Sequence, residues 1–155
     1  MKLISSAFKQ GEKIPQKYTC EGFNWNPPLQ FLDVPRQTKS LVLIIDDPDV
    51  PETIRADGLW IHWIVYDIPP TTTIVKEHSV APGTPGKGTN GRTAYMGPCP
   101  PDTEHRYFFK LFALDAFLDL PKGLTIDEIQ QKMEGHVIEK AELMGRYELL
   151  KKRMT

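Results

Sequence analysis

The sequence predicts a mainly β, antiparallel sandwich-like domain with two short helices near its C-terminus. Fourteen prolines and eleven glycines are spread over 155 residues, and they separate short runs of β-branched and aromatic residues. Each proline fixes φ and removes a backbone donor, so these runs are typical of strands joined by ordered loops. A chain of this length can bury roughly two thirds of its unfolded surface in one core. We therefore expect residues 1–155 to form one domain.

Strands are expected where apolar runs are bounded by turn residues. In chain order they are Met1–Phe8, Leu29–Val34, Leu41–Ile45, Leu59–Ile68, Thr71–Val75 and His105–Leu114. The β-branched run at 71–75 is short and is predicted as an edge strand. Long loops rich in proline and glycine connect the strands, and the loop that runs straight into His105 is the most proline-rich.

Alternation along two strands brings polar aromatic residues together. A period of two places on one face of the strand at 59–68 the residues Trp60, His62, Ile64 and Tyr66. The same period places His105 and Tyr107 on one face of the last predicted strand. Arg106 then points to the opposite face, where we expect a salt bridge to an acid such as Asp67.

The C-terminal part changes from strand-like to helix-like patterns. Thr125 and Glu128 form a capping box before apolar residues at helical spacing, and Gly135 is the expected stop. Val137–Tyr147 is predicted as a second amphipathic helix, with Val137, Ala141 and Met144 on one face. Lys151-Lys152-Arg153 is a short basic tail that indicates no partner.

One glycine pattern is misleading. Gly86-Lys87-Gly88-Thr89-Asn90-Gly91 matches the G-x-G-x-x-G pattern of dinucleotide-binding proteins. That pattern binds pyrophosphate only when it follows a strand and opens a helix. Prolines precede this stretch and Tyr95-Met96-Gly97-Pro98 follows it, so we interpret it as a connecting loop.

Charge and composition exclude several classes of protein. Nineteen basic and twenty acidic residues give a net charge of −1, so the chain lacks the excess of positive charge that is typical of nucleic-acid-binding proteins. The first residues lack the apolar region of a signal peptide, and no apolar run approaches the roughly 20 residues of a membrane span. Cys20 and Cys99 could pair, but without a signal sequence reduced thiols are the favoured interpretation. We predict a cytoplasmic protein.

Three sequence blocks, which occur in a fixed order, make the chain recognisable. They are Asp46-Asp47-Pro48-Asp49-Val50-Pro51, Trp60-Ile61-His62-Trp63, and the stretch from Tyr95 to Tyr107 with its Gly-Pro-Cys-Pro-Pro and His-Arg-Tyr. Together they resemble the phosphatidylethanolamine-binding protein family, and within it the short bacterial Raf-kinase-inhibitor-like branch. Smaller matches lie at 18–22, 27–29 and 141–143, so the resemblance covers nearly the whole chain.

The residue types in these blocks are suited to an anion pocket. His62 and His105 lie beside aromatic residues and proline-locked loops. Imidazoles and a tyrosine hydroxyl can donate to phosphate oxygens, and backbone N–H groups near Gly97 and Cys99 could add further donors. An acid such as Asp47 would orient one imidazole and raise its pKa.

The resemblance implies a defined set of pocket residues. They are Asp47, Trp60, His62, Gly97, Cys99, Pro100, His105 and Tyr107, with Asp49 and Tyr95 at the rim. It also implies a non-enzymatic protein without a cofactor, which binds phosphate, acetate or phosphoryl headgroups and could inhibit a kinase or protease. Trp60 and Tyr95 would supply an apolar rim for a headgroup cation, whereas Asp49 is favoured as a loop-bracing residue.

Two other functions remain open. Asp47, His62 and His105 could hold a divalent metal for hydrolysis, or one histidine could act as a general base. Cys99 as a nucleophile lacks a positioned base. Alternatively the pocket is vestigial and the protein acts through its surface, where an exposed Trp25 or Tyr66 would mark a homodimer contact.

The chain also departs from the family pattern. Asp102-Thr103-Glu104 replaces a stretch that usually contains glycine, and the added acids would make the rim less favourable to anions. Glu21 and Asn24 stand where aspartate is usual, and we expect altered hydrogen bonding of a supporting loop rather than lost binding. The chain is shorter than the mammalian members, so their C-terminal helix over the pocket mouth is not expected here.

Overall fold

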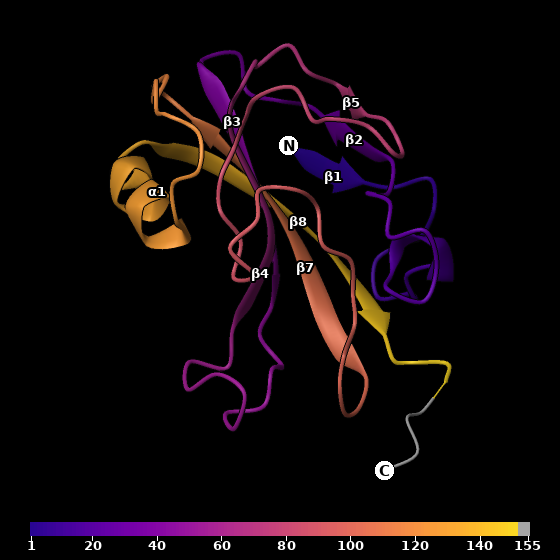
Figure 1. The fold of residues 1–155 in the computed structure, drawn as a ribbon. Coiled ribbons are helices and arrows are strands. Elements are labelled where there is room, and N and C mark those ends of the chain that lie inside the picture. The colour runs from indigo at the N-terminus through magenta and orange to yellow at the C-terminus, as the bar shows by residue number, and fades with distance from the viewer. Residues whose placement is uncertain (152–155) are drawn as a thin grey trace.

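Two antiparallel sheets enclose the main core of the computed structural model, which describes residues 1–151 (Figure 1). The smaller sheet has the order β1 (Lys2–Ile4), β2 (Leu29–Leu32) and β5 (Ile74–Val75). The larger sheet has the order β6 (Thr84–Pro85), β4 (Trp60–Ile68), β3 (Ser40–Asp47), β7 (His105–Leu114) and β8 (Val137–Tyr147). A 3-10 turn, η1 (Gln16–Tyr18), precedes β2, and α1 (Ile126–Met133) lies between β7 and β8 in the chain. The mainly β prediction is confirmed.

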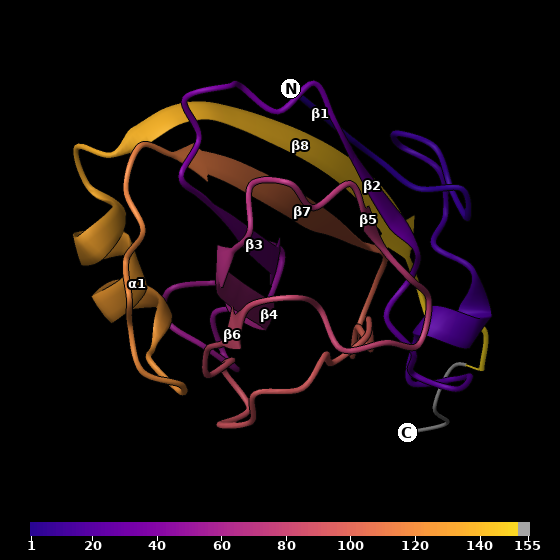
Figure 2. The same cartoon turned by 90° about the horizontal axis from the view of Figure 1, so that it is seen from above.

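The larger sheet is covered on both faces. Its inner face packs against the smaller sheet through residues such as Leu3, Phe31, Leu43, Phe109 and Leu143. Its outer face is covered at one end by α1, as Figure 2 shows, and the residues packed there are Val42, Ile44, Ile64, Tyr66, Ile129 and Met133. Burial on both faces explains why β3 reads as a continuous apolar run instead of an alternating one.

A β-bulge in β4 changes the predicted alternation. Ile45 pairs with Trp63 while its neighbour Asp46 pairs with Ile61, so His62 is an extra residue without a partner in β3. A bulge re-aims the side chains on either side of it. The prediction that Ile64 and Tyr66 share the face of His62 is therefore wrong, because these two residues pack in the cluster under α1.

The C-terminal prediction is half right. Thr125 caps α1 with the predicted capping box, and Gly135 follows the helix with φ +79°. Val137–Tyr147, however, is strand β8, which pairs with β7 along its length. Its apolar residues satisfy a period of two as well as a helical one, and Ala141, Leu143 and Tyr147 all face the core. Pairing with a long neighbouring strand overrides the helix propensity of the segment.

Segment 11–14 lies along the outer edge of β8. The N–H of Gly11 donates to the carbonyl of Met144, and the N–H of Ile14 to that of Arg146. Arg146 in turn donates its N–H to the carbonyl of Glu12. Of the predicted basic tail, residues 152 and 153 lie outside the described part of the chain. No helix within residues 1–151 is both long and apolar enough to cross a membrane.

Candidate functional site

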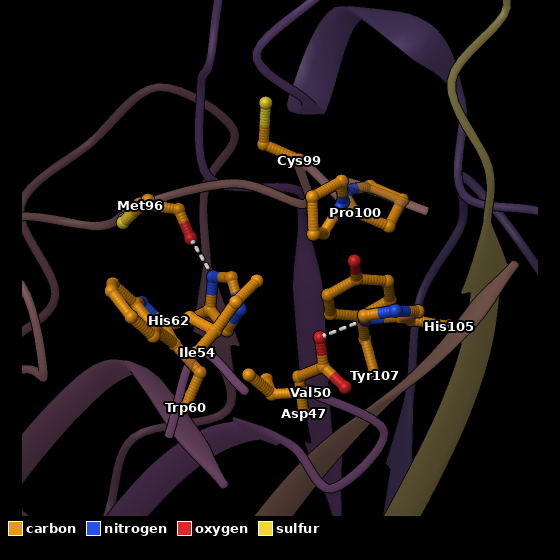
Figure 3. Close-up of a pocket in the computed structure, with 11 residues that line it drawn as sticks. Asp47, Val50, Ile54, Trp60, His62, Met96, Cys99, Pro100, His105 and Tyr107 are labelled. Atoms are coloured by element: carbon orange, nitrogen blue, oxygen red, sulfur yellow. Dashed lines mark hydrogen bonds and ion pairs between the residues drawn. The ribbon is translucent and has the colours of Figure 1, made fainter. Parts of the chain in front are cut away.

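One cavity lies where β3, β4 and β7 meet two long loops. In Figure 1 the β3–β4 loop and the loop before β7 are found together at the lower end of the larger sheet. The cavity has a volume of about 190 Å³. Its lining consists of Asp47, Val50, Ile54, Trp60, His62, Met96, Cys99, Pro100, Pro101, His105 and Tyr107. Figure 3 shows Trp60, Ile54 and His62 on one side, with His105 and Tyr107 opposite them.

The structure brings seven of the ten expected site residues to this cavity and places three elsewhere. Gly97 donates its N–H to Asn24 Oδ1 at 2.7 Å, and a Cβ at this position would collide with the Tyr18 carbonyl. Close packing therefore explains this glycine. Tyr95 donates its hydroxyl to the same Tyr18 carbonyl at 2.8 Å, outside the cavity lining.

Asp49 braces the loop that leads out of β3. Its carboxylate accepts hydrogen bonds from the backbone N–H and the guanidinium of Arg106, at 2.8–2.9 Å. The expected pairing of Arg106 with Asp67 is therefore wrong. Asp67 instead accepts the backbone N–H groups of Leu118 and Leu120.

Four lining residues were missed by sequence reasoning. Met96 and Pro101 lie inside the recognised 95–107 block, so the block itself was the available signal. Val50 and Ile54 come from the β3–β4 loop. Ile54 is a large apolar residue in a mostly polar loop and remains half exposed, which is the pattern expected of a residue at a pocket mouth.

His105 is held between two carboxylates. Its Nδ1 lies 2.6 Å from Asp47 Oδ2 and its Nε2 lies 2.6 Å from Asp102 Oδ1. Burial lowers the pKa of His105, but the two carboxylates outweigh burial and raise it. Burial raises the pKa of Asp47, against the opposing hydrogen bonds from His105 and from the N–H of Asp49. With both ring nitrogens bound to carboxylates, the imidazolium form is the stabilised one.

His62 has the opposite environment. Its Nδ1 lies 2.7 Å from the carbonyl oxygen of Met96. A carbonyl can only accept, so Nδ1 must carry the proton. Burial lowers the pKa of His62 to about 4, and the ring is neutral at pH 7. Nε2 is then unprotonated and accepts hydrogen bonds, whereas the sequence suggested that this imidazole would donate to a phosphate oxygen.

Two hydrogen-bond donors in the cavity lining have no partner within the described residues. The hydroxyl of Tyr107 is buried and points towards Pro100 (Figure 3), and the indole N–H of Trp60 is also unpaired. Burial raises the pKa of Tyr107, so the hydroxyl keeps its proton. A buried donor without an acceptor costs about 1–3 kcal/mol, and a cavity lined by two of them is suited to a ligand that brings acceptors.

A disulfide joins the loop of the cavity to the N-terminal part of the chain. Cys20 and Cys99 are bonded to each other, so the prediction of reduced thiols is wrong. The two loops are already held together, because the N–H of Cys20 donates to the carbonyl of Pro98. No sequence pattern reveals this proximity between residues 79 positions apart. A bonded Cys99 also has no thiol that could act as a nucleophile.

Glu21 and Asn24 support neighbouring loops, as their position in the sequence suggested. Glu21 accepts hydrogen bonds from the Tyr147 hydroxyl and from the N–H groups of Leu150 and Lys151. Asn24 holds the N–H of Gly97. Asn24 therefore acts on the cavity through the position of its wall, whereas Glu21 holds the end of β8 and the residues that follow it.

Two of the three residues considered for a metal site, Asp47 and His105, are bound to each other. Within residues 1–151 no group of three or more His, Cys, Asp and Glu side chains is arranged to hold a metal ion. Coordination by His105 would require the ring to give up one of its two carboxylate partners.

Comparison with known proteins places this geometry in a family. The sequence profile of the phosphatidylethanolamine-binding proteins matches residues 4–148. A UPF0098 protein of Chlamydia pneumoniae is 53% identical over 148 residues, which are 96% of this chain and 99% of that protein. A UPF0098 protein of Methanothermobacter thermautotrophicus is 42% identical over 153 residues, which are 95% of this chain and 98% of that protein.

Solved structures agree with the sequence comparison. A phosphatidylethanolamine-binding protein homologue from Chlamydia trachomatis superposes with a TM-score of 0.93 at 49% identity, covering 96% of this chain and 97% of that one. YbcL of Escherichia coli, described as a new member of the mammalian PEBP family, superposes with a TM-score of 0.84 at 27% identity, covering 96% of this chain and 98% of that one.

Proposed function

The chain belongs to the phosphatidylethanolamine-binding protein family, and from this premise we propose that its cavity binds a small oxyanion or a phosphoryl group without catalysis. The unpaired, buried hydroxyl of Tyr107 is the observation that carries the proposal. It is a donor on strand β7, on a residue that lines the cavity, and a phosphoryl oxygen would satisfy it. The indole N–H of Trp60 offers a second donor to the same ligand.

The size of the cavity limits the ligand. Its volume of about 190 Å³ is below the range of roughly 300–1,000 Å³ that accommodates a drug-sized molecule. A phosphate, an acetate or a headgroup such as phosphorylethanolamine fits this limit, and the rest of a larger ligand would remain outside. Ile54 and Trp60 would then contact the part at the mouth.

The tautomer of His62 selects a ligand that also donates. Its Nε2 accepts, so the ligand should carry one O–H or N–H besides its acceptor oxygens. A phosphate monoester has a second pKa near ~6, and its monoanion keeps one O–H. Such a monoanion satisfies Tyr107, Trp60 and His62 together.

Inhibition of a kinase or protease would follow if the phosphoryl group belonged to a segment of that enzyme. This partner, and a homodimer, remain proposals. Tyr66 cannot mark a dimer surface, because it is fully buried and its hydroxyl donates to the Pro121 carbonyl. Disulfides persist mainly outside reducing compartments, so the Cys20–Cys99 bond speaks against a cytoplasmic location, which was predicted from the lack of a signal-peptide pattern and of a membrane span.

The test replaces one hydroxyl. We expect Tyr107→Phe to weaken binding of phosphate or phosphorylethanolamine about tenfold to a hundredfold, since a hydrogen bond to a charged group contributes about 1.5–3 kcal/mol. Isothermal titration calorimetry and tryptophan fluorescence, with and without EDTA, measure it. Tyr95→Phe is the matched control, because it removes a buried hydroxyl that is bonded outside the cavity lining.

Equal affinity of Tyr107→Phe and the wild type would contradict the proposal. Binding that EDTA abolishes, or phosphate released from phosphorylethanolamine during the titration, would favour the hydrolase that uses Asp47, His62 and His105. Binding of no ligand by the wild type would favour the interaction protein with a vestigial pocket.

A further inference from the structure

We propose that Asp102 competes with the ligand anion for His105. Its carboxylate accepts the Nε2–H of His105 and must give up this ion pair when an anion binds. This inference rests on the proposed function, because it concerns the same cavity. It assigns to Asp102 a role in selecting weakly charged ligands over strongly charged ones.

The first step is the charge of the cavity. Among the described residues, no lysine or arginine belongs to the lining. His62 is neutral because burial lowers its pKa to about 4. His105 is therefore the source of positive charge, and it is bound on one side by Asp47 and on the other by Asp102. Two carboxylates against one imidazolium leave the cavity with a negative balance, which opposes an anion.

The second step distinguishes the two carboxylates. Asp47 is buried, and its second oxygen accepts the N–H of Asp49 at 2.8 Å, so it is fixed in the protein. Asp102 has a side chain that is 44% exposed, in a bend between Pro100 and β7. Slight burial would raise the pKa of Asp102, but the N–H of Thr103 and His105 lower it, so the group is a carboxylate. An exposed carboxylate can turn into solvent at small cost, and Asp102 is thus the one that an incoming anion can replace.

The third step is that the neighbouring acid is used differently. The carboxylate of Glu104 pairs with Arg146 at 2.8 Å, whereas the ion pairs of His105 are with Asp47 and Asp102. The two acids of this departure from the family pattern are therefore not equivalent. Asp102 acts on the charged group of the cavity, whereas Glu104 joins β7 to β8.

The experiment compares three proteins with inorganic phosphate as the probe. Asp102→Asn keeps an oxygen that can accept from His105 but removes the charge. We expect it to bind phosphate about tenfold more tightly than the wild type, the size of effect that one nearby charge produces close to a protein surface. Glu104→Gln removes the same charge two residues away, and we expect its affinity to stay within about twofold of wild type at an ionic strength of about 0.15 M, where charges on the surface are screened.

A second readout separates charge selection from a merely structural role. The affinity gain of Asp102→Asn should be larger for phosphate at pH 8, where the dianion dominates, than for acetate, which carries a single charge. Thermal denaturation of each variant shows that it is folded. A structural effect of the substitution would change both affinities by the same factor.

The outcomes are distinct. If the wild type binds phosphate and Asp102→Asn binds it equally well, the inference is overturned while the proposed function stands. A gain in Glu104→Gln as large as that in Asp102→Asn would also overturn it, because general rim charge would then be sufficient. If neither the wild type nor Asp102→Asn binds phosphate or acetate, the proposed function itself fails.

Discussion

His62 and His105 lie in the same cavity, yet their environments push their pKa values in opposite directions. His62 has a carbonyl partner and no carboxylate, so burial dominates and lowers its pKa. His105 has two carboxylate partners, which raise its pKa in spite of burial. One ring is thus a neutral acceptor and the other a charged donor, and a ligand with both kinds of hydrogen-bonding group matches them.

The buried neutral state of His62 makes stability depend on pH. In the unfolded chain this ring takes up a proton below pH 6.5, whereas in the folded protein it does so only near pH 4. The unfolded state therefore binds more protons between these values, and stability falls as the pH falls through this window. A shift from 6.5 to about 4 corresponds to about 3 kcal/mol.

We expect urea denaturation to show this loss between pH 7 and pH 4. In His62→Asn the loss should be smaller by about 3 kcal/mol, whereas His136→Asn, which removes a half-exposed histidine, should retain it. The same slope in wild type and His62→Asn would mean that His62 titrates normally. Nitrogen-15 chemical shifts of the ring test the tautomer separately, and an unprotonated Nδ1 in the neutral ring would contradict the hydrogen bond to the Met96 carbonyl.

At the scale of elements, the loop from Tyr95 to Glu104 depends on contacts that are far away in sequence. Asn24 holds the N–H of Gly97, the Tyr18 carbonyl holds the hydroxyl of Tyr95, and Cys20 holds Cys99. All three partners belong to the segment around η1. The wall of the cavity is therefore fixed by a loop near the N-terminus that itself lies outside the cavity lining.

The disulfide is the strongest of these ties. A disulfide typically stabilises a protein by about 2–4 kcal/mol, and longer closed loops gain more than short ones. We expect the free energy of unfolding of Cys20→Ser/Cys99→Ser to be lower than that of the wild type by this amount, so that the variant unfolds at a lower urea concentration. The wild type should approach the variant when a reductant is added. A reductant should not affect the double variant. Identical midpoints for all samples would show that the bond adds nothing to stability.

Helices and strands could be predicted from the sequence where the spacing of the apolar residues fitted either a strand or a helix but not both. The strands at β2, β3, β4 and β7 and the capping box of α1 fall in the expected segments. β8 was missed because its apolar residues allow two interpretations: Ala141 and Met144 lie three positions apart, as on one face of a helix, whereas Ala141 and Leu143 lie two positions apart, as on one face of a strand. Only the pairing with β7 decides between them. The bulge at His62 was missed because it is a property of register between two strands, which no single strand encodes.

At the scale of the whole molecule, the cavity is made by three strand ends and two loops. The three sequence blocks indicated which segments meet there, because a resemblance to a family implies the fold of that family. The hydrogen-bonding character of the cavity could not be predicted in the same way. It depends on the Met96 carbonyl at His62 and on Asp102 at His105, and both contacts arise only when the loops are placed.

Ligand binding in such a cavity should stabilise the entire fold. At a phosphate concentration of about 100 times the dissociation constant, the gain in unfolding free energy is about 2.7 kcal/mol. We expect the melting temperature of the wild type to rise with phosphate, and that of Tyr107→Phe to rise only at a higher concentration. Chloride at matched ionic strength is the control. A rise of the same size with chloride would indicate screening instead of binding.

The position of segment 11–14 along β8 has a consequence for how the protein behaves in concentrated solution. A long strand at the border of a sheet offers unpaired donors and acceptors to other chains, and such borders are starting points for aggregation. Here the C-terminal half of β8 is already occupied by Gly11, Glu12 and Ile14. The other half carries Glu139, Lys140 and Glu142, whose charges disfavour the approach of an identical strand. The larger sheet is thereby kept from extending into a neighbouring molecule.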